Sequence, residues 1–145
     1  MKFAPAELEE YISATQLEER IKEIGQQITK DYQGKDLVVI GVLNGCILFY
    51  SDLIRHIELP ITCDFLGLSS YGSETTSSGN VQLTYPLPSD LEKSHVLVVE
   101  DIVDTGNSMN FLWSQLQRQN PSTLQLCSLL SKPSRRQVDV QIDHL

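Results

Sequence analysis

The sequence predicts an α/β fold in which helices flank a mainly parallel sheet. Runs of apolar residues of strand length alternate along the chain with segments of helical pattern. The runs at 37–42, 95–100 and 123–130 are nearly continuous, as in strands that are buried on both faces of a parallel sheet. The 145 residues contain no internal repeat and no low-complexity linker, so we expect a single domain over 1–145.

Residues 15–33 have the pattern of an amphipathic helix. Apolar side chains recur there at steps of three or four, at Leu17, Ile21, Ile24, Ile28 and Tyr32. Thr15 and Glu18 match the capping-box pattern at a helix start, and Gly34 is a natural stop. We therefore expect the first helix to cover this range.

The other elements are assigned from length, composition and breaker residues. We expect helices at 46–57 and 107–120, strands at 61–68 and 81–85, and a turn at 43–45. Pro121 ends the second of these helices. Between the strands lies SSYGSETTSSGN, residues 69–80, which is small and polar and too long for a tight turn. Loops of this length are often lids or disordered segments.

Composition excludes several classes of protein. The net charge of −8 argues against nonspecific binding to nucleic acid or to an acidic membrane surface, because such partners usually require a basic patch. The sequence shows no secretory leader pattern and no apolar run of membrane-spanning length, so we expect a cytoplasmic protein. Cys46, Cys63 and Cys127 have no metal-binding spacing and lie in apolar contexts. They are predicted to be buried free thiols in a reducing compartment.

Three polar stretches follow predicted strands. They are LNG at 43–45, EDIVDTGNS at 100–108 and SKPSRR at 131–136. In parallel α/β sheets, ligands bind beyond the carboxyl ends of the strands. The three stretches are therefore predicted to meet at one ligand site.

The stretch DTGNS, residues 104–108, has the chemistry of an anion cradle. Gly106 allows a tight turn, and the amides from Thr105 to Ser108 open a predicted helix, where they can point at one phosphate. The hydroxyls of Thr105 and Ser108 can assist. An ordinary capped strand-to-helix turn is the simpler alternative that these residues leave open.

Three acids lie beside this cradle. Glu100 and Asp101 can accept hydrogen bonds from hydroxyl groups, hold a metal ion, or both, and Asp104 can act as a general base. A phosphorylated sugar such as ribose 5-phosphate would satisfy both the amides and the acids. Simple solvation of acids at a strand end is the competing interpretation.

Four stretches resemble motifs of the hypoxanthine-guanine branch of the type I phosphoribosyltransferases. VVEDIVDTGNS resembles the signature for phosphoribosyl pyrophosphate (PRPP), and GVLNGCILFYSDL resembles the pyrophosphate-binding segment. LSSYGSETTSSG resembles the mobile catalytic loop, and LLSKPSRRQVDV the strand end that reads the purine. The four are collinear. The resemblance implies the type I phosphoribosyltransferase fold and purine salvage: Mg²⁺-dependent transfer of the 5-phosphoribosyl group from PRPP to hypoxanthine or guanine, giving IMP or GMP and pyrophosphate.

The resemblance also implies a role for each matching residue on the PRPP side. Thr105, Gly106, Asn107 and Ser108 would bind the 5′-phosphate, and Glu100 and Asp101 the ribose hydroxyls and Mg²⁺. Pyrophosphate would lie at Arg136 and at the turn Leu43, Asn44 and Gly45, which in the family often has a cis peptide. Many relatives have Lys or Arg where this chain has Asn44, which leaves the backbone role but removes a charge contact.

On the purine side, the resemblance implies that Asp104 faces N7 of the base as the catalytic acid–base group. Lys132 would donate to the 6-oxo oxygen, and an ammonium offers no acceptor for the 6-amino group of adenine. Ser70 and Tyr71 would belong to the mobile loop that closes over the reacting atoms. Arg135 is expected to face solvent or a partner chain, and family members form dimers or tetramers.

Two alternatives to a hypoxanthine-guanine enzyme stay open. One is a non-catalytic regulator that binds PRPP or a nucleotide on the same fold; the other is a xanthine-guanine enzyme. Family members continue beyond QIDHL with groups that read the purine 2-position, so the preference between hypoxanthine and guanine is not decided. If the chain truly ends at Leu145, we expect weak purine binding and little turnover, while the PRPP half could persist.

Overall fold

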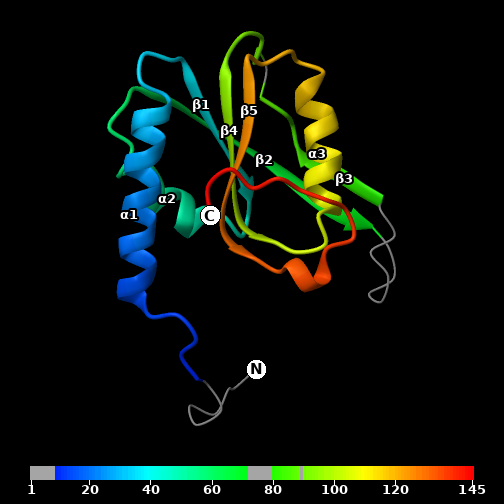
Figure 1. Cartoon of the computed structure of the whole chain (residues 1–145). Helices are drawn as coiled ribbons and strands as arrows, with labels where there is room; N and C mark the ends of the chain where they lie inside the picture. Colours follow the sequence, from blue (N-terminus) through cyan, green and yellow to red (C-terminus); the bar gives the residue numbers. More distant parts are fainter. Residues whose placement is uncertain (1–8, 72–79, 89) are drawn as a thin grey trace.

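The computed structural model confirms the α/β class, with helices on both faces of a single sheet (Figure 1). It describes residues 9–71, 80–88 and 90–145. The elements in chain order are α1 (Ala14–Asp31), β1 (Leu37–Leu43), α2 (Ile47–Ile54), β2 (Ile61–Tyr71), β3 (Asn80–Tyr85), β4 (His95–Val103), α3 (Asn107–Gln117), β5 (Thr123–Ser131) and a short 3-10 helix, η2 (Pro133–Arg135).

The strand order places a topological switch point in the middle of the sheet. The order is β3-β2-β1-β4-β5, with β3 antiparallel to β2 and every other pair parallel. From β1 the chain moves outward to β2 on one side, and it later resumes at β4 on the other side. The two strands pair as far as Gly41 and Val99, after which β1 ends at Leu43 and β4 continues to Val103, so their carboxyl ends lie at the same edge of the sheet. Such a crevice is where ligands of open α/β sheets bind.

Alternate side chains of the central strands enter two separate cores. Helices α1 and α2 cover one face, and α3 covers the other (Figure 1). Val39 and Leu97 pack in the first core, whereas Val38 and Val96 pack in the second. All four are buried, as continuous apolar strands of a parallel sheet should be, and burying each such side chain contributes roughly 1.5–3 kcal/mol.

The start of α1 differs from the sequence prediction. Ser13 is the N-cap: its Oγ accepts from the Gln16 N–H at 3.1 Å, and its own N–H donates to Gln16 Oε1 at 2.9 Å. The capping box predicted at Thr15 and Glu18 is therefore two residues too late, because Ser13 already satisfies the first helical N–H groups. The helix ends at Asp31 with Tyr32 as its C-cap, two residues before the predicted end at 33, and Gly34 lies in the following turn with a φ of +75°.

The strand β4 is longer than predicted and changes the setting of the acids. It runs to Val103, because Glu100 pairs with Ser128 and Val103 with Ser131 of β5. Glu100, predicted as the last residue of the strand, and Asp101, predicted to follow it, therefore both lie inside the strand. In the sequence, two acidic residues after an apolar run look like the end of a strand. In the structure, the backbone pairing of β4 with β5 continues past them to Val103.

The strand β2 also exceeds its predicted end at 68. It reaches Tyr71 because its last residues pair with β3; Ser69 lies opposite Gln82. The first part of the predicted loop at 69–80 is therefore strand, and residues 72–79 lie outside the described residues. Helices α2 and α3 are shorter than the predicted 46–57 and 107–120.

The cysteines are only partly as predicted. Cys46 and Cys127 are buried free thiols, and burial raises the pKa of each to about 12. Cys63 is exposed, which corrects the prediction of three buried thiols. No helix within 9–71, 80–88 and 90–145 is long and apolar enough to cross a membrane.

Candidate active site

One wall of the crevice at the switch point is the turn that follows β1. The Leu43–Asn44 peptide is cis, as in the family turn that the sequence resembles. Gly45 lies directly against Asp101 of β4: a Cβ atom at Gly45 would sit 2.6 Å from Asp101 Oδ2. Only glycine allows this approach, so the turn and the acid form one packed unit.

The side chains of Asp101 and Glu100 lie in different parts of the site. Successive side chains of a strand point to opposite faces, and Asp101 meets the 43–45 turn while Glu100 lines a cavity beside residues 104–108. Burial raises the pKa of Glu100 to about 8, and the neighbouring Asp101 adds to this effect. The acid pair predicted from the sequence therefore joins the two halves of the site.

The loop after β4 turns its carbonyl groups toward a second segment, residues 131–138, which we call the strap. Each carbonyl accepts a hydrogen bond: Val103 O from Lys132 N, Asp104 O from Arg136 Nη1, Thr105 O from Gln137 N and Val138 N, and Gly106 O from Asn110 N of α3, at 2.8–3.1 Å. The strap supplies all of these donors except the last. The opposite side of the loop is left with the N–H groups of Thr105 and Gly106, neither of which donates to another described residue.

Gly106 makes this arrangement possible. Its φ is +89°, and a Cβ atom there would lie 2.6 Å from the carbonyl oxygen of Val138 in the strap. Helix α3 begins at the next residue, so its N-terminal end faces the same space. A cavity of about 100 Å³ opens there, lined by Glu100, Asp104, Ser108 and the loop between them. The stretch that the sequence predicts to be an anion cradle thus lines this cavity, and we keep the name cradle for residues 104–108.

Asp104 lies at the edge of the cradle. Arg135 Nε is 3.1 Å from its Oδ1, an ion pair between two partly exposed side chains. Oδ1 itself is shielded from solvent and accepts no aligned hydrogen bond from the described residues. The polar contact described for this oxygen is therefore an ion pair with an exposed arginine rather than an aligned hydrogen bond.

The basic residues of the strap have separate positions. Lys132 is exposed, and only its backbone N–H is engaged with the loop. Arg136 turns inward, where Nη1 donates to Asp104 O at 2.9 Å and Nη2 to Ser131 Oγ at 2.7 Å. The sequence did not indicate two residues that help to hold the loop. Ser131 binds Arg136, and the backbone of Gln137 binds Thr105. They lie some 30 residues from the loop, and no local pattern signals such pairing.

Some predicted site residues are not placed by the structure. Ser70 and Tyr71 are at the end of β2, but their side chains lie outside the described part of the molecule. Among the residues that the structure describes, no group of three or more His, Cys, Asp or Glu side chains could hold a metal ion. Any metal at Glu100 and Asp101 would therefore need further ligands from a substrate or water.

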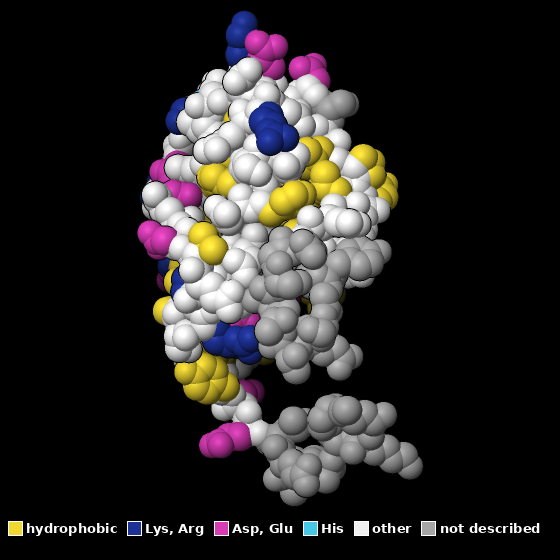
Figure 2. Space-filling model, turned by 90° about the vertical axis from the view of Figure 1, so that its right-hand side faces the viewer, with side chains coloured by type: hydrophobic (Ala, Val, Ile, Leu, Met, Phe, Trp, Pro, Cys, Tyr) yellow, Lys and Arg dark blue, Asp and Glu magenta, His cyan; other side chains and the backbone are white. Residues whose placement is uncertain are grey.

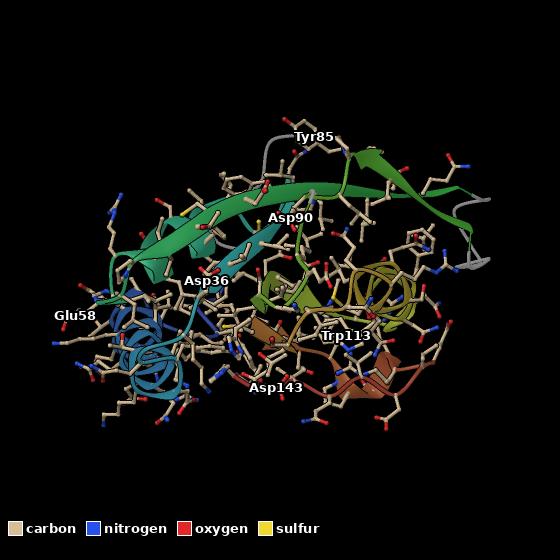
Figure 3. The ribbon with its side chains drawn as sticks, turned by 90° about the horizontal axis from the view of Figure 1, so that it is seen from above. Asp36, Glu58, Tyr85, Asp90, Trp113 and Asp143 are labelled. Atoms are coloured by element: carbon tan, nitrogen blue, oxygen red, sulfur yellow. The ribbon has the colours of Figure 1, made fainter. Side chains whose placement is uncertain are left out.

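A second cavity lies beside α3, and the sequence did not indicate it. Its volume is about 170 Å³, and its lining includes Met109, Trp113, Asp139 and Asp143. Figure 3 shows Trp113 and Asp143 on the same side of the molecule, away from Tyr85. The face that carries α3 and β3 also exposes apolar side chains between polar ones (Figure 2). Tyr85, at the end of β3, is 56% exposed.

The class of protein follows from this fold and site. Residues 8–144 match the family model described as "Phosphoribosyl transferase domain". That range contains the turn after β1, the acids of β4, the cradle and the strap. The chain therefore belongs to the phosphoribosyltransferase family, and its architecture is the type I fold.

Comparison with similar proteins shows to which branch of the family the chain belongs. The chain is 43% identical over 135 residues to a hypoxanthine phosphoribosyltransferase of Haemophilus influenzae, covering 91% of this chain and 75% of that protein. It is 42% identical over 124 residues to a hypoxanthine-guanine phosphoribosyltransferase of Staphylococcus aureus, covering 86% and 69%. A crystal structure of a hypoxanthine phosphoribosyltransferase from Staphylococcus aureus superposes with a TM-score of 0.89 at 39% identity, over 94% of this chain and 74% of that one. Within its family, the chain thus falls in the hypoxanthine-guanine branch of transferases.

Proposed function

We propose that this chain acts in purine salvage and transfers the 5-phosphoribosyl group of PRPP to a 6-oxopurine, hypoxanthine or guanine. The products would be IMP or GMP and pyrophosphate, and the reaction would use Mg²⁺. A cytoplasmic location and a dimeric or tetrameric state remain predictions from the sequence.

One observation carries the proposal. Every carbonyl of the loop at 103–106 accepts a hydrogen bond, whereas the N–H groups of Thr105 and Gly106 donate to no described residue, and both residues line the cavity. Glu100 lines the same cavity, and Asp101 adjoins it. Amides favour a phosphate, while carboxylates favour sugar hydroxyls and a ring that becomes positively charged. A phosphorylated ribose that reacts through an oxocarbenium-like transition state needs both.

The residues then divide the work of the reaction. The amides and hydroxyls from Thr105 to Ser108 would fix the 5′-phosphate and hence the position of the anomeric carbon. Glu100 and Asp101 would hold the ribose hydroxyls and favour positive charge on the ring as pyrophosphate departs. The turn at 43–45 would bind pyrophosphate through its backbone. The family loop to which Ser70 and Tyr71 would belong, and which would exclude water that could hydrolyse PRPP, corresponds largely to residues 72–79, outside the described residues.

Asp104 and Lys132 would handle the base. Asp104 lines the cavity, and its Oδ1 is paired with the exposed Arg135 without an aligned hydrogen bond, which suits a carboxylate that exchanges a proton at N7 of the purine. Lys132 is exposed at the end of β5 and free to reach the 6-oxo oxygen. An ammonium can donate to that oxygen but cannot accept from an amino group, so adenine is expected to be a poor substrate.

The acid pair fits Mg²⁺ held jointly with the substrate. This ion usually binds through one or two carboxylates plus phosphate oxygens and water, rather than in an all-protein cage. Glu100 and Asp101 supply that number of carboxylates, and burial raises the pKa of Glu100 to about 8, so a cation beside it would favour its charged form. When bound, the ion would neutralise the pyrophosphate and orient it as a leaving group.

The test is nucleotide formation with PRPP, Mg²⁺ and each purine base in turn, followed by chromatography. We expect nucleotide from hypoxanthine, guanine or both, and none from adenine. Asp104→Asn should still bind PRPP but lose turnover by roughly 10²–10⁴-fold, as expected for a general acid–base group.

The outcomes separate the candidates. PRPP binding without turnover for any base would favour the non-catalytic regulator, and turnover with xanthine and guanine alone would favour the xanthine-guanine enzyme. Nucleotide from adenine alone would overturn the role of Lys132. Unchanged turnover in Asp104→Asn would remove Asp104 from the mechanism.

A further inference from the structure

Arg136 is a side chain that joins the ends of two strands. Its guanidinium donates through Nη1 to the backbone oxygen of Asp104, beyond β4, and through Nη2 to Ser131 Oγ, at the end of β5. Its Cδ would lie 3.4 Å from a Cβ atom at Gly106, so the aliphatic stem also packs on the loop. The side chain is half-buried, and both terminal nitrogens are used within the protein.

We infer that Arg136 is a positioning residue that aims the first amide of the phosphate cradle, and that it is not a ligand of pyrophosphate. This inference rests on the proposed function and deepens it, since it concerns how the same site holds the sugar phosphate.

The peptide between Asp104 and Thr105 gives the physical reason. In a trans peptide, the carbonyl of one residue and the N–H of the next are fixed in one plane and point in opposite directions. The bond from Arg136 Nη1 holds Asp104 O toward the strap, so the N–H of Thr105 must point toward the cavity. The next peptide behaves in the same way. The backbone of the strap holds Thr105 O, so the N–H of Gly106 points away from the strap.

Among the hydrogen bonds described for the loop carbonyls at 103–106, the one to Asp104 O comes from a side chain, that of Arg136. The carbonyls of Val103, Thr105 and Gly106 accept from backbone N–H groups, whereas Asp104 O accepts from a side chain. Without Arg136, the Asp104–Thr105 peptide could rotate and present its oxygen to the phosphate, which would repel it. Arg135 cannot substitute, because its Nε contacts the Asp104 carboxylate rather than the main chain, and its side chain is 62% exposed.

Two ligands distinguish positioning from direct contact with pyrophosphate. Ribose 5-phosphate carries the 5′-phosphate and no pyrophosphate, whereas PRPP carries both. Binding of each, with Mg²⁺, is measured by titration calorimetry to the whole chain and to its variants. If Arg136 aims the cradle, Arg136→Ala should weaken both ligands by a similar factor, about tenfold, the usual effect of losing a hydrogen bond from a charged group.

The variants form a matched set. Arg136→Lys restores one donor and should recover part of the affinity for both ligands. Ser131→Ala removes the second anchor and should weaken both ligands less, and adding it to Arg136→Ala should cause no further loss. Arg118→Ala, an exposed arginine at the far end of α3, is the control and should bind both ligands normally.

The outcomes are distinct. If Arg136→Ala weakens PRPP binding and leaves ribose 5-phosphate binding unchanged, Arg136 is a pyrophosphate ligand and the inference is overturned. Unchanged binding of both ligands would also overturn the inference. If thermal melting shows that Arg136→Ala is unfolded, the binding of PRPP and of ribose 5-phosphate is compared in Arg136→Lys and Ser131→Ala instead. If the unaltered chain binds neither ligand, the proposed function itself fails.

Discussion

At the scale of single residues, two glycines determine the shape of the site. Gly45 allows the turn after β1 to touch Asp101, and Gly106 allows the cradle loop to pass against Val138 of the strap. In both cases a Cβ atom would be only 2.6 Å from an oxygen atom, and Gly106 also has a left-handed backbone. The sequence marked both glycines as turn residues, but not the oxygens that they approach.

Gly106→Ala should therefore abolish sugar-phosphate binding. The left-handed conformation alone costs an alanine roughly 1–2 kcal/mol, and relief of the contact with Val138 must also move the strap away from the loop. We expect a lower urea midpoint and no PRPP binding in calorimetry.

Gly34→Ala is the matched control for this prediction. Gly34 also has a positive φ, +75°, but a Cβ atom there would meet nothing within 4 Å. It should lose a similar amount of stability from backbone strain and keep normal PRPP binding. Equal PRPP affinity in the two variants would contradict the role given to the contact between Gly106 and the strap.

The role of a site residue could be predicted where the residues that act together are neighbours in the sequence. The residues from Asp104 to Ser108 are contiguous, so their turn chemistry is visible in the sequence, as is the acid pair beside them. The inward direction of Arg136 could not be predicted, because its partners, Asp104 O and Ser131, are brought to it only by the pairing of β4 with β5.

At the scale of elements, the types were predictable and the ends were not. Apolar periodicity indicates which segments are helices and strands, since it reports burial. It does not indicate where the backbone ladder stops, as Glu100 and Asp101 demonstrate by continuing β4 with polar side chains. The N-terminus of α1 was misplaced because two capping patterns overlap there, and only one can be used.

Ser13→Ala and Thr15→Ala test this reassignment of the cap. Loss of the Ser13 hydroxyl removes a bond to Gln16 N and should destabilise the protein by about 1 kcal/mol in urea unfolding. Thr15→Ala should have little effect or be slightly stabilising, because Thr15 lies within the helix and alanine is the better helix former. The reverse order would restore the sequence-based assignment. Neither change should affect PRPP binding.

At the scale of the whole molecule, the strand order explains how distant motifs meet. The turn at 43–45 and the acids at 100–101 are far apart in the sequence, and the switch between β1 and β4 brings them into contact. The sequence predicted this convergence through the alternation of strands and helices. It placed residues 131–136 at the same site, but it did not predict that this segment would hold the carbonyl groups of the loop after β4.

The net charge has its consequence at this scale too. With a net charge of −8, the overall field does not attract an anionic substrate, so affinity for PRPP must come from local groups. The cradle amides, the end of α3 and Mg²⁺ are the groups that could supply it. This is why the direction of a few N–H groups matters more here than it would in a basic protein.

The central claim is that PRPP binds with its 5′-phosphate on the cradle after β4. Its most direct test is a titration of the ¹⁵N-labelled chain with PRPP and Mg²⁺, with the amide resonances assigned. The largest shifts should be those of Thr105, Gly106 and Ser108, followed by the 43–45 turn. Shifts centred instead on the cavity beside Trp113, with the cradle amides unchanged, would contradict it.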